Sequence, residues 1–143
     1  MLKGIPNIIP PELLKILAEM GHGDELTIGD ANFPGHTYCD NVVRMDGHGA
    51  PEILDAILSL FPLDSFDDHP VTLMAVSPGD DTQPVIWDEY RKIVAKYDSN
   101  AADKIINIDR FDFYKKVAGR STAVVMTGEK ALYACIILKK GVL

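Results

Sequence analysis

The most unusual stretch of the sequence places a histidine between two glycines. His22 follows a predicted helix and stands between Gly21 and Gly23 in the segment MGHGDE. The glycines leave the imidazole sterically uncrowded, and an imidazole with an ordinary pKa of about 6.5 both gives and takes protons near neutral pH. His22 is therefore a candidate general acid–base, although a histidine at a helix C-terminus also interacts with the last free carbonyl groups. The next two residues, Asp24 and Glu25, are expected to form a solvated turn.

Three further polar residues stand where a predicted strand begins or ends. Asp30 follows a strand at its carboxyl end, where α/β sheets bind ligands, but it also suits a turn or a cap for the loop that begins at Asn32. Arg110 begins a helix directly after a buried strand. A cation is unfavourable there in the helix dipole, which favours a ligand-facing role, with a surface position as the alternative. Tyr133 lies near the start of the last predicted strand, where it is either a core or interface tyrosine or a hydroxyl that faces a ligand.

Motifs for metals, nucleotides and serine nucleophiles are absent. His36 and His48 flank the second predicted strand, but no HxH, HExxH or CxxC pair occurs in the chain. Scattered histidines alone indicate a metal only weakly. Neither GHG segment continues into a dinucleotide fingerprint, and GxxxxGKS/T and GxSxG are missing. The sequence therefore predicts no metal and no cofactor.

The composition is that of an acidic globular domain. The 143 residues are 47% hydrophobic and carry a formal charge of −7, and a chain of this length buries a core without disulfides. An acidic surface repels phosphates, so nucleic acid and anionic membranes are poor partners. Pro6, Pro10 and Pro11 interrupt any apolar run of a signal peptide, and no stretch approaches the ~18–20 apolar residues of a membrane span. We expect a soluble, cytoplasmic protein.

Apolar periodicity predicts helices that alternate with short strands. The expected helices cover 11–20, with Gly21 as a left-handed stop, 51–61, 85–97 and 110–118, closed by Gly119 and capped by Asp109. The expected strands cover 25–31, 42–45, 71–76, 105–108, 122–128 and 132–138. Two strand pairs adjoin without a helix between them. The pattern predicts an α/β fold, a three-layer α/β/α sandwich with a mixed, largely parallel sheet, as a single domain over residues 1–143.

Several segments resemble one known family. LKGIPNIIPPELLKILAEMGHGDELTIGDANFPGH, VVRMDG, INIDRFDFYKKVAG, TGEKALY and ILKKGV occur in this order from Leu2 to Val142. They resemble the ribose pyranase/fucose mutarotase family. RFDFY together with TGE is more similar to the L-fucose mutarotase branch than to the ribose pyranase branch. The resemblance covers almost the whole chain.

The resemblance implies an activity and roles for three of the residues above. Members of the family interconvert anomers of free sugars without a cofactor, and they form homo-oligomers that are decameric in many bacteria. The proton-transferring histidine of the family falls on His22, its substrate-binding aspartate on Asp30 and its binding arginine on Arg110. The implied ligand is a monosaccharide, L-fucose in this branch.

A fourth motif of the family is altered in this chain. Where the family carries Tyr-Gly-Asn or Tyr-Ala-Asn as a substrate-binding tripeptide, this sequence has Tyr133, Ala134 and Cys135. The missing asparagine puts one polar contact with the sugar in doubt. Two alternatives therefore stay open beside an L-fucose mutarotase: a ribose pyranase-like isomerase of another monosaccharide, and a non-catalytic sugar-binding subunit in which His22 is only structural.

Overall fold

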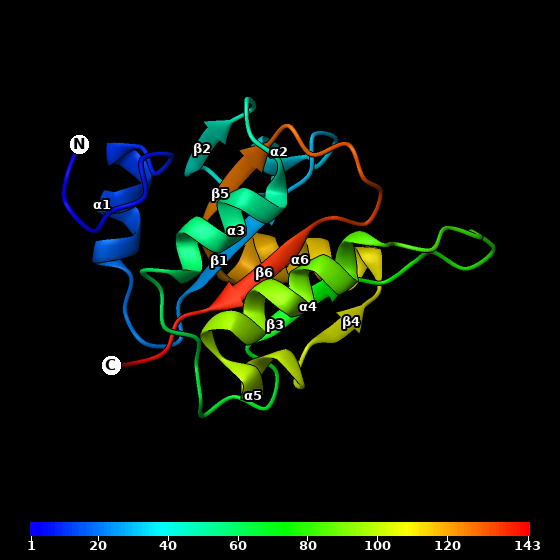
Figure 1. Cartoon of the computed structure of the whole chain (residues 1–143). Coiled ribbons are helices and arrows are strands. Elements are labelled where there is room, and N and C mark those ends of the chain that lie inside the picture. Colours follow the sequence, from blue (N-terminus) through cyan, green and yellow to red (C-terminus); the bar gives the residue numbers. More distant parts are fainter.

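A six-stranded sheet runs through the computed structural model, which describes residues 1–143 (Figure 1). Its strand order is β2-β5-β1-β6-β3-β4. The strands are β1 Glu25–Gly29, β2 Val42–Met45, β3 Val71–Met74, β4 Ile106–Ile108, β5 Ser121–Thr127 and β6 Ile136–Lys139. All neighbouring pairs are parallel except those of β6, which is antiparallel to both β1 and β3. The predicted mixed, largely parallel sheet is confirmed.

Helices cover both faces of this sheet, as Figure 1 shows for α3 and α4 in front and α6 behind. The helices are α1 Pro11–Glu19, α2 Gly35–Tyr38, α3 Ala50–Leu58, α4 Ile86–Tyr97, α5 Ser99–Ala102 and α6 Arg110–Arg120. Residues of α1, α3, α4 and α5 form one apolar core, and residues of α6 form a second core against which α2 packs. Alternate residues of β5 enter the two cores, Val125 the first and Val124 the second, as the two-residue period of a strand requires. The three-layer α/β/α sandwich is therefore confirmed.

Three helix ends, those of α1, α3 and α6, differ from the prediction. The helix α3 ends at Leu58 rather than at residue 61. The first helix stops because Met20 is extended, and the glycine with a positive φ is Gly23 rather than Gly21. Gly119 does not close α6 but lies inside its last turn. The predicted cap of α6 is confirmed, since the Asp109 carboxylate accepts the N–H groups of Phe111 and Asp112.

The last strand is shorter than predicted. It begins at Ile136, and Tyr133 lies before it with φ 58°, the only non-glycine residue with a positive φ. The short helices α2 and α5 were not predicted, because four residues give no usable periodicity. The strands that adjoin in sequence do not pair: β5 separates β1 from β2, and β1 separates β5 from β6.

The strand directions define two ends of the sheet. The parallel strands β1 to β5 all finish at one end, called here the carboxyl end, and β6 starts there. At the opposite amino end, β1 to β5 begin and β6 finishes. No helix in the chain is both long enough and apolar enough to cross a membrane.

A close approach at the amino end depends on a glycine, and we expect Gly141→Ala to lower the free energy of unfolding. The Gly141 N–H donates to the Pro62 carbonyl, and a methyl group at this position would collide with the Leu63 carbonyl oxygen. Overpacking of this kind costs roughly 1–3 kcal/mol. Urea unfolding measures the change.

Gly119→Ala is the matched control, because a methyl group there meets nothing within 4 Å. Since alanine is more favourable in a helix than glycine, we expect the free energy of unfolding of this variant to rise by up to about 1 kcal/mol. Equal stability of Gly141→Ala and wild type would show that the segment around Leu63 moves freely.

Candidate functional site

Four of the predicted site residues meet at the carboxyl end of the sheet. Asp30, Arg110, Tyr133 and Cys135 line one cavity of about 240 Å³. The cavity is completed by apolar and polar side chains from several elements: Asn32, Phe33, Met74, Ser77, Asp80, Tyr114 and Leu132. Ala134 does not join them, because its side chain is buried in the core that α3 and α4 cover.

Asp30 is held by its own turn and by the buried cysteine. Its Oδ1 accepts the Asn32 N–H at 2.9 Å, so the turn role considered for Asp30 is present together with its place in the cavity. The Cys135 thiol donates to Oδ2 at 3.4 Å, and the Asp30 N–H donates to Sγ at 3.5 Å. Burial, together with the nearby Asp30 charge, raises the pKa of Cys135, which therefore remains a thiol. In this chain Cys135 therefore helps to hold Asp30 in place through these two hydrogen bonds.

Tyr133 is fixed by the segment between β3 and α4. Its phenol donates to Asp80 Oδ2 at 2.5 Å and accepts the Ser77 N–H at 3.2 Å. The Tyr133 carbonyl accepts the Trp87 indole N–H at 2.9 Å. These contacts hold the uncommon backbone conformation of Tyr133 in place.

Aromatic side chains lie beside Arg110 and behind the cavity residue Tyr114. The Arg110 guanidinium lies 5.0 Å from the centre of the Phe111 ring. Tyr114, one turn further along α6, stacks on Tyr38 at 4.9 Å between ring centres, and burial raises its pKa. A cation beside aromatic faces suits a ligand with both hydroxyl groups and C–H surfaces.

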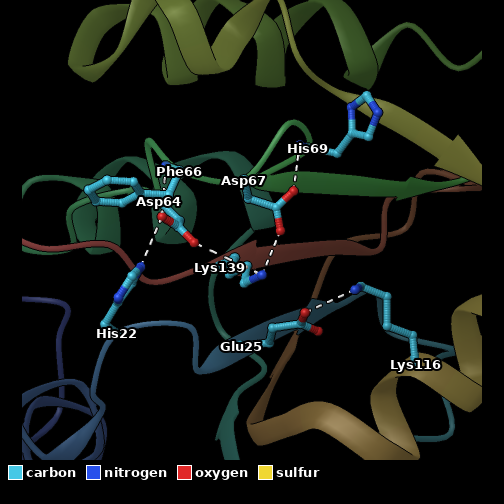
Figure 2. A network of polar contacts seen from close by, with 8 residues as sticks. All are labelled: His22, Glu25, Asp64, Phe66, Asp67, His69, Lys116 and Lys139. Atoms are coloured by element: carbon cyan, nitrogen blue, oxygen red, sulfur yellow. Dashed lines mark hydrogen bonds and ion pairs between the residues drawn. The ribbon is translucent and has the colours of Figure 1, made fainter.

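His22 lies at the other end of the sheet. It lines a separate cavity of about 560 Å³ together with Asp64, Phe66 and Lys139. Its Nε2 lies 3.1 Å from Asp64 Oδ1, and its ring lies 5.6 Å from that of Phe66 (Figure 2). Since a carboxylate only accepts, Nε2 carries the hydrogen, and Nδ1 is left free to exchange a proton. The structure of one chain does not bring His22 to the other predicted residues.

Asp64 is a functional candidate that sequence reasoning missed. Its side chain is only 4% exposed. Burial opposes its ionisation, yet the hydrogen bonds from the Phe66 N–H and His22 lower the pKa of Asp64 below its usual value. Lys139 Nζ lies 3.9 Å from Oδ2 and donates to Asp67 at 2.5 Å (Figure 2). Asp64 is therefore an ionised, fixed partner for the imidazole of His22.

Glu25, which was expected in a solvated turn, is 3% exposed and begins β1. Its Oε1 accepts from Lys116 of α6 at 2.9 Å, while Oε2 has no partner (Figure 2). The expected solvent exposure is wrong because Lys116 of α6 reaches this end of β1, whereas the predicted start of the strand at residue 25 is confirmed. The burial of Glu25 could not be predicted from the local sequence, because its partner Lys116 lies far along the chain.

The other histidines are engaged individually. His36 lies 3.3 Å from Arg44, His48 lies 3.0 Å from Glu52, and His69, which lines the cavity of His22, lies 3.2 Å from the Lys104 carbonyl oxygen. No group of three or more His, Cys, Asp or Glu side chains is arranged to hold a metal ion. Independence from metals and cofactors stays a prediction.

The fold and the residues at the two ends of its sheet define a family. The chain matches the RbsD / FucU transport protein family over residues 3–143 and belongs to it. It is 45% identical to the L-fucose mutarotase of Actinobacillus pleuropneumoniae, over 99% of this chain and 97% of the relative.

Two solved structures are similar over almost the whole chain. FucU from Bifidobacterium longum is 52% identical with a TM-score of 0.96, and 99% of each chain is covered. The fucose mutarotase of Streptococcus pneumoniae, solved in complex with L-fucose, is 46% identical with a TM-score of 0.93, again over 99% of each chain. The resemblance to this family that the motifs indicated is confirmed.

The cysteine in the altered tripeptide gives a testable pair of variants. An asparagine at 135 can accept the Asp30 N–H and donate to Oδ2, replacing two weak thiol bonds with stronger ones. We expect Cys135→Asn to hold or raise kcat/KM for anomer exchange of L-fucose. Cys135→Ala removes both bonds, and we expect it to lower the affinity roughly threefold to tenfold.

Nuclear magnetic resonance exchange rates on L-fucose compare the two variants, and their thermal stabilities control for misfolding. A large loss in Cys135→Asn, with no loss in Cys135→Ala, would show that the cavity is not built around a hydrogen bond to Asp30.

Proposed function

We propose that this chain interconverts the α and β anomers of L-fucose by opening and closing the hemiacetal ring. The observation that carries the proposal is the cavity at the carboxyl end, where Asp30, Arg110 and Tyr133 meet although they are distant in sequence. The similarity to mutarotases, one of them solved with L-fucose, supports the sugar class. The reaction changes no oxidation state and calls for acid–base groups alone.

The cytoplasm is the predicted location of the protein, since both cysteines are free thiols, as is usual in reducing compartments.

Ring opening requires two proton movements on the sugar. The anomeric hydroxyl loses its proton, the bond between C1 and the ring oxygen breaks, and the ring oxygen gains a proton. The aldehyde then rotates about one bond, and the reverse steps close the ring on its other face. Each positioned acid–base group contributes typically about 10²–10⁴-fold. In this proposal His22 Nδ1 takes the proton of the anomeric hydroxyl and gives it to the ring oxygen, and the ionised Asp64 stabilises the imidazolium that forms between the two transfers.

The remaining polar groups of the cavity bind the sugar. The Asp30 carboxylate accepts hydrogen bonds from sugar hydroxyls, and the Arg110 guanidinium donates to hydroxyls or polarises the ring oxygen. The phenol of Tyr133 contributes a further hydrogen bond, while Tyr114 and Phe33 give apolar surface for the C–H face and methyl group.

His22 must reach the sugar from a second copy of the chain. It precedes β1 and Asp30 follows β1, whose five residues span about 16 Å at the usual rise. A single sugar ring is far shorter than this separation. We therefore propose a homo-oligomer in which the amino end of one copy faces the carboxyl end of the next. A head-to-tail contact makes a ring when the rotation between copies closes, and we propose this closed form.

Exposed aromatic side chains support this arrangement. Phe66, beside His22, is 77% exposed, and Phe111, beside Arg110, is 62% exposed. Leu132 at the same cavity is also exposed. Burial of exposed apolar surface favours association, and an exposed phenylalanine lies beside each half of the proposed site.

The proposed activity is tested by exchange spectroscopy on free sugars. We expect the wild-type chain to accelerate anomer exchange of L-fucose more than that of D-ribose. His22→Ala should reduce the rate at least about 100-fold, while the oligomer and the thermal stability stay as in wild type. His36→Ala, which replaces a histidine that lines neither cavity, should leave the rate unchanged. Absence of exchange in the wild type, or a near-native rate in His22→Ala, would contradict the proposal.

The sharing of one site between copies is tested by mixing two inactive variants. His22→Ala and Asp30→Asn are each expected to lose exchange, because each lacks one half of every site. When the two chains are co-assembled in equal amounts, roughly a quarter of the sites combine both intact halves by random assortment. We therefore expect about a quarter of the wild-type rate. Mixed oligomers that remain inactive would show that both residues must belong to one chain.

A further inference from the structure

The carboxylate of Asp80 accepts hydrogen bonds from Thr82 and Tyr133 with both of its oxygens. Its Oδ1 accepts the Thr82 N–H at 2.8 Å and the Thr82 hydroxyl at 2.6 Å, and its Oδ2 accepts the Tyr133 hydroxyl at 2.5 Å. The hydrogen bonds from the Thr82 hydroxyl and from Tyr133 lower the pKa of Asp80. The Asp80 side chain is therefore ionised at neutral pH and accepts the hydrogen bond that the Tyr133 hydroxyl donates.

The phenol of Tyr133 has little freedom to rearrange. Its oxygen already accepts the Ser77 N–H, and its only hydrogen is directed to Asp80. Two residues of α4 hold the backbone that follows, since the Trp87 indole donates to the Tyr133 carbonyl and the Tyr90 hydroxyl donates to the Ala134 carbonyl at 2.6 Å. A ligand in the cavity therefore finds one acceptor position on the phenolic oxygen.

We infer that Asp80 is a positioning residue that fixes the direction of the Tyr133 hydrogen bond, so that Tyr133 meets the sugar as an acceptor. This inference rests on the proposed function and adds a rule of selectivity to it. The sugar must carry a free hydroxyl that donates to Tyr133. A sugar in which that hydroxyl is replaced by fluorine, or blocked by alkylation or acylation, is rejected at this position.

Replacement of Asp80 by asparagine should reverse the bond. An asparagine offers one accepting and one donating side. The N–H and the hydroxyl of Thr82 continue to donate to the side-chain oxygen at position 80, so the amide nitrogen of the new asparagine faces Tyr133. The phenolic oxygen then accepts from both Ser77 and the amide, and its hydrogen turns to the cavity. Tyr133 becomes a donor to the sugar without a change in the shape of the site.

The test compares binding of L-fucose with that of its 2-, 3- and 4-deoxyfluoro analogues. A C–F group accepts weakly and cannot donate, so in the wild type it leaves the Tyr133 lone pair unpaired. At one ring position we expect fluorine to weaken wild-type binding about tenfold, the loss of one hydrogen bond. In Asp80→Asn the loss at that position should shrink to about twofold or less, and in Tyr133→Phe it should also disappear.

Two further variants make the result decisive. Asp80→Ala frees the phenol to rotate and should relax the same ring position, which keeps the test valid if Asp80→Asn folds poorly. Asp81→Asn, an exposed neighbour without a contact to Tyr133, should keep the wild-type pattern. A merely structural role of Asp80 would weaken all four ligands equally and leave their ratios unchanged.

The possible failures are distinguishable. If folded Asp80→Asn and Asp80→Ala keep the wild-type fluorine ratios at every ring position, the inference is wrong while the proposed function stands. The inference is also wrong, and the proposed function again stands, if no fluorine ratio depends on Tyr133. If the wild type neither binds L-fucose nor accelerates its exchange, both the proposed function and this inference are wrong.

Discussion

The antiparallel pairing of β6 with β1 is the interaction on which both ends of the molecule depend. At the carboxyl end, the pair Ile28 and Ile136 sets Cys135 beside Asp30. At the amino end, the pair Glu25 and Lys139 brings the Lys139 ammonium to Asp67 and to Asp64, the carboxylate that holds His22 in place. A slip of one residue would exchange the two faces of β6 and break both arrangements at once. The register of four hydrogen-bonded residues therefore fixes the chemistry at both ends.

The strand β1 also separates the two halves of the proposed site. The residues before a strand and the residues after it lie at opposite ends of the sheet, so His22 and Asp30 cannot meet within one chain. The carboxyl end supplies hydrogen bonds and aromatic surface, and the amino end supplies a histidine with a buried carboxylate partner. Each end leaves a large aromatic side chain exposed. Assembly would cover these side chains and complete the catalytic group in a single step.

Much of the fold and half of the site could be predicted from sequence. Apolar periodicity located four helices and six strands, and Asp109 was recognisable as a cap because capping is local. The residues around Asp30 were found from their places near strand ends and from the family motifs. Asp64 and Asp80 were missed because their partners lie 42 and 53 residues away. Both stand in polar, proline-bounded segments that look like ordinary connectors, and nothing in their local spacing points to His22 or Tyr133.

The central claim, that exchange requires two copies of the chain, is tested most directly by dilution. The rate of L-fucose exchange per chain is measured over a series of protein concentrations, and the molar mass is measured by light scattering on the same samples. The account predicts that the rate per chain falls together with the mass, and that a species of 15.7 kDa is inactive. A monomer with the full rate per chain would contradict it.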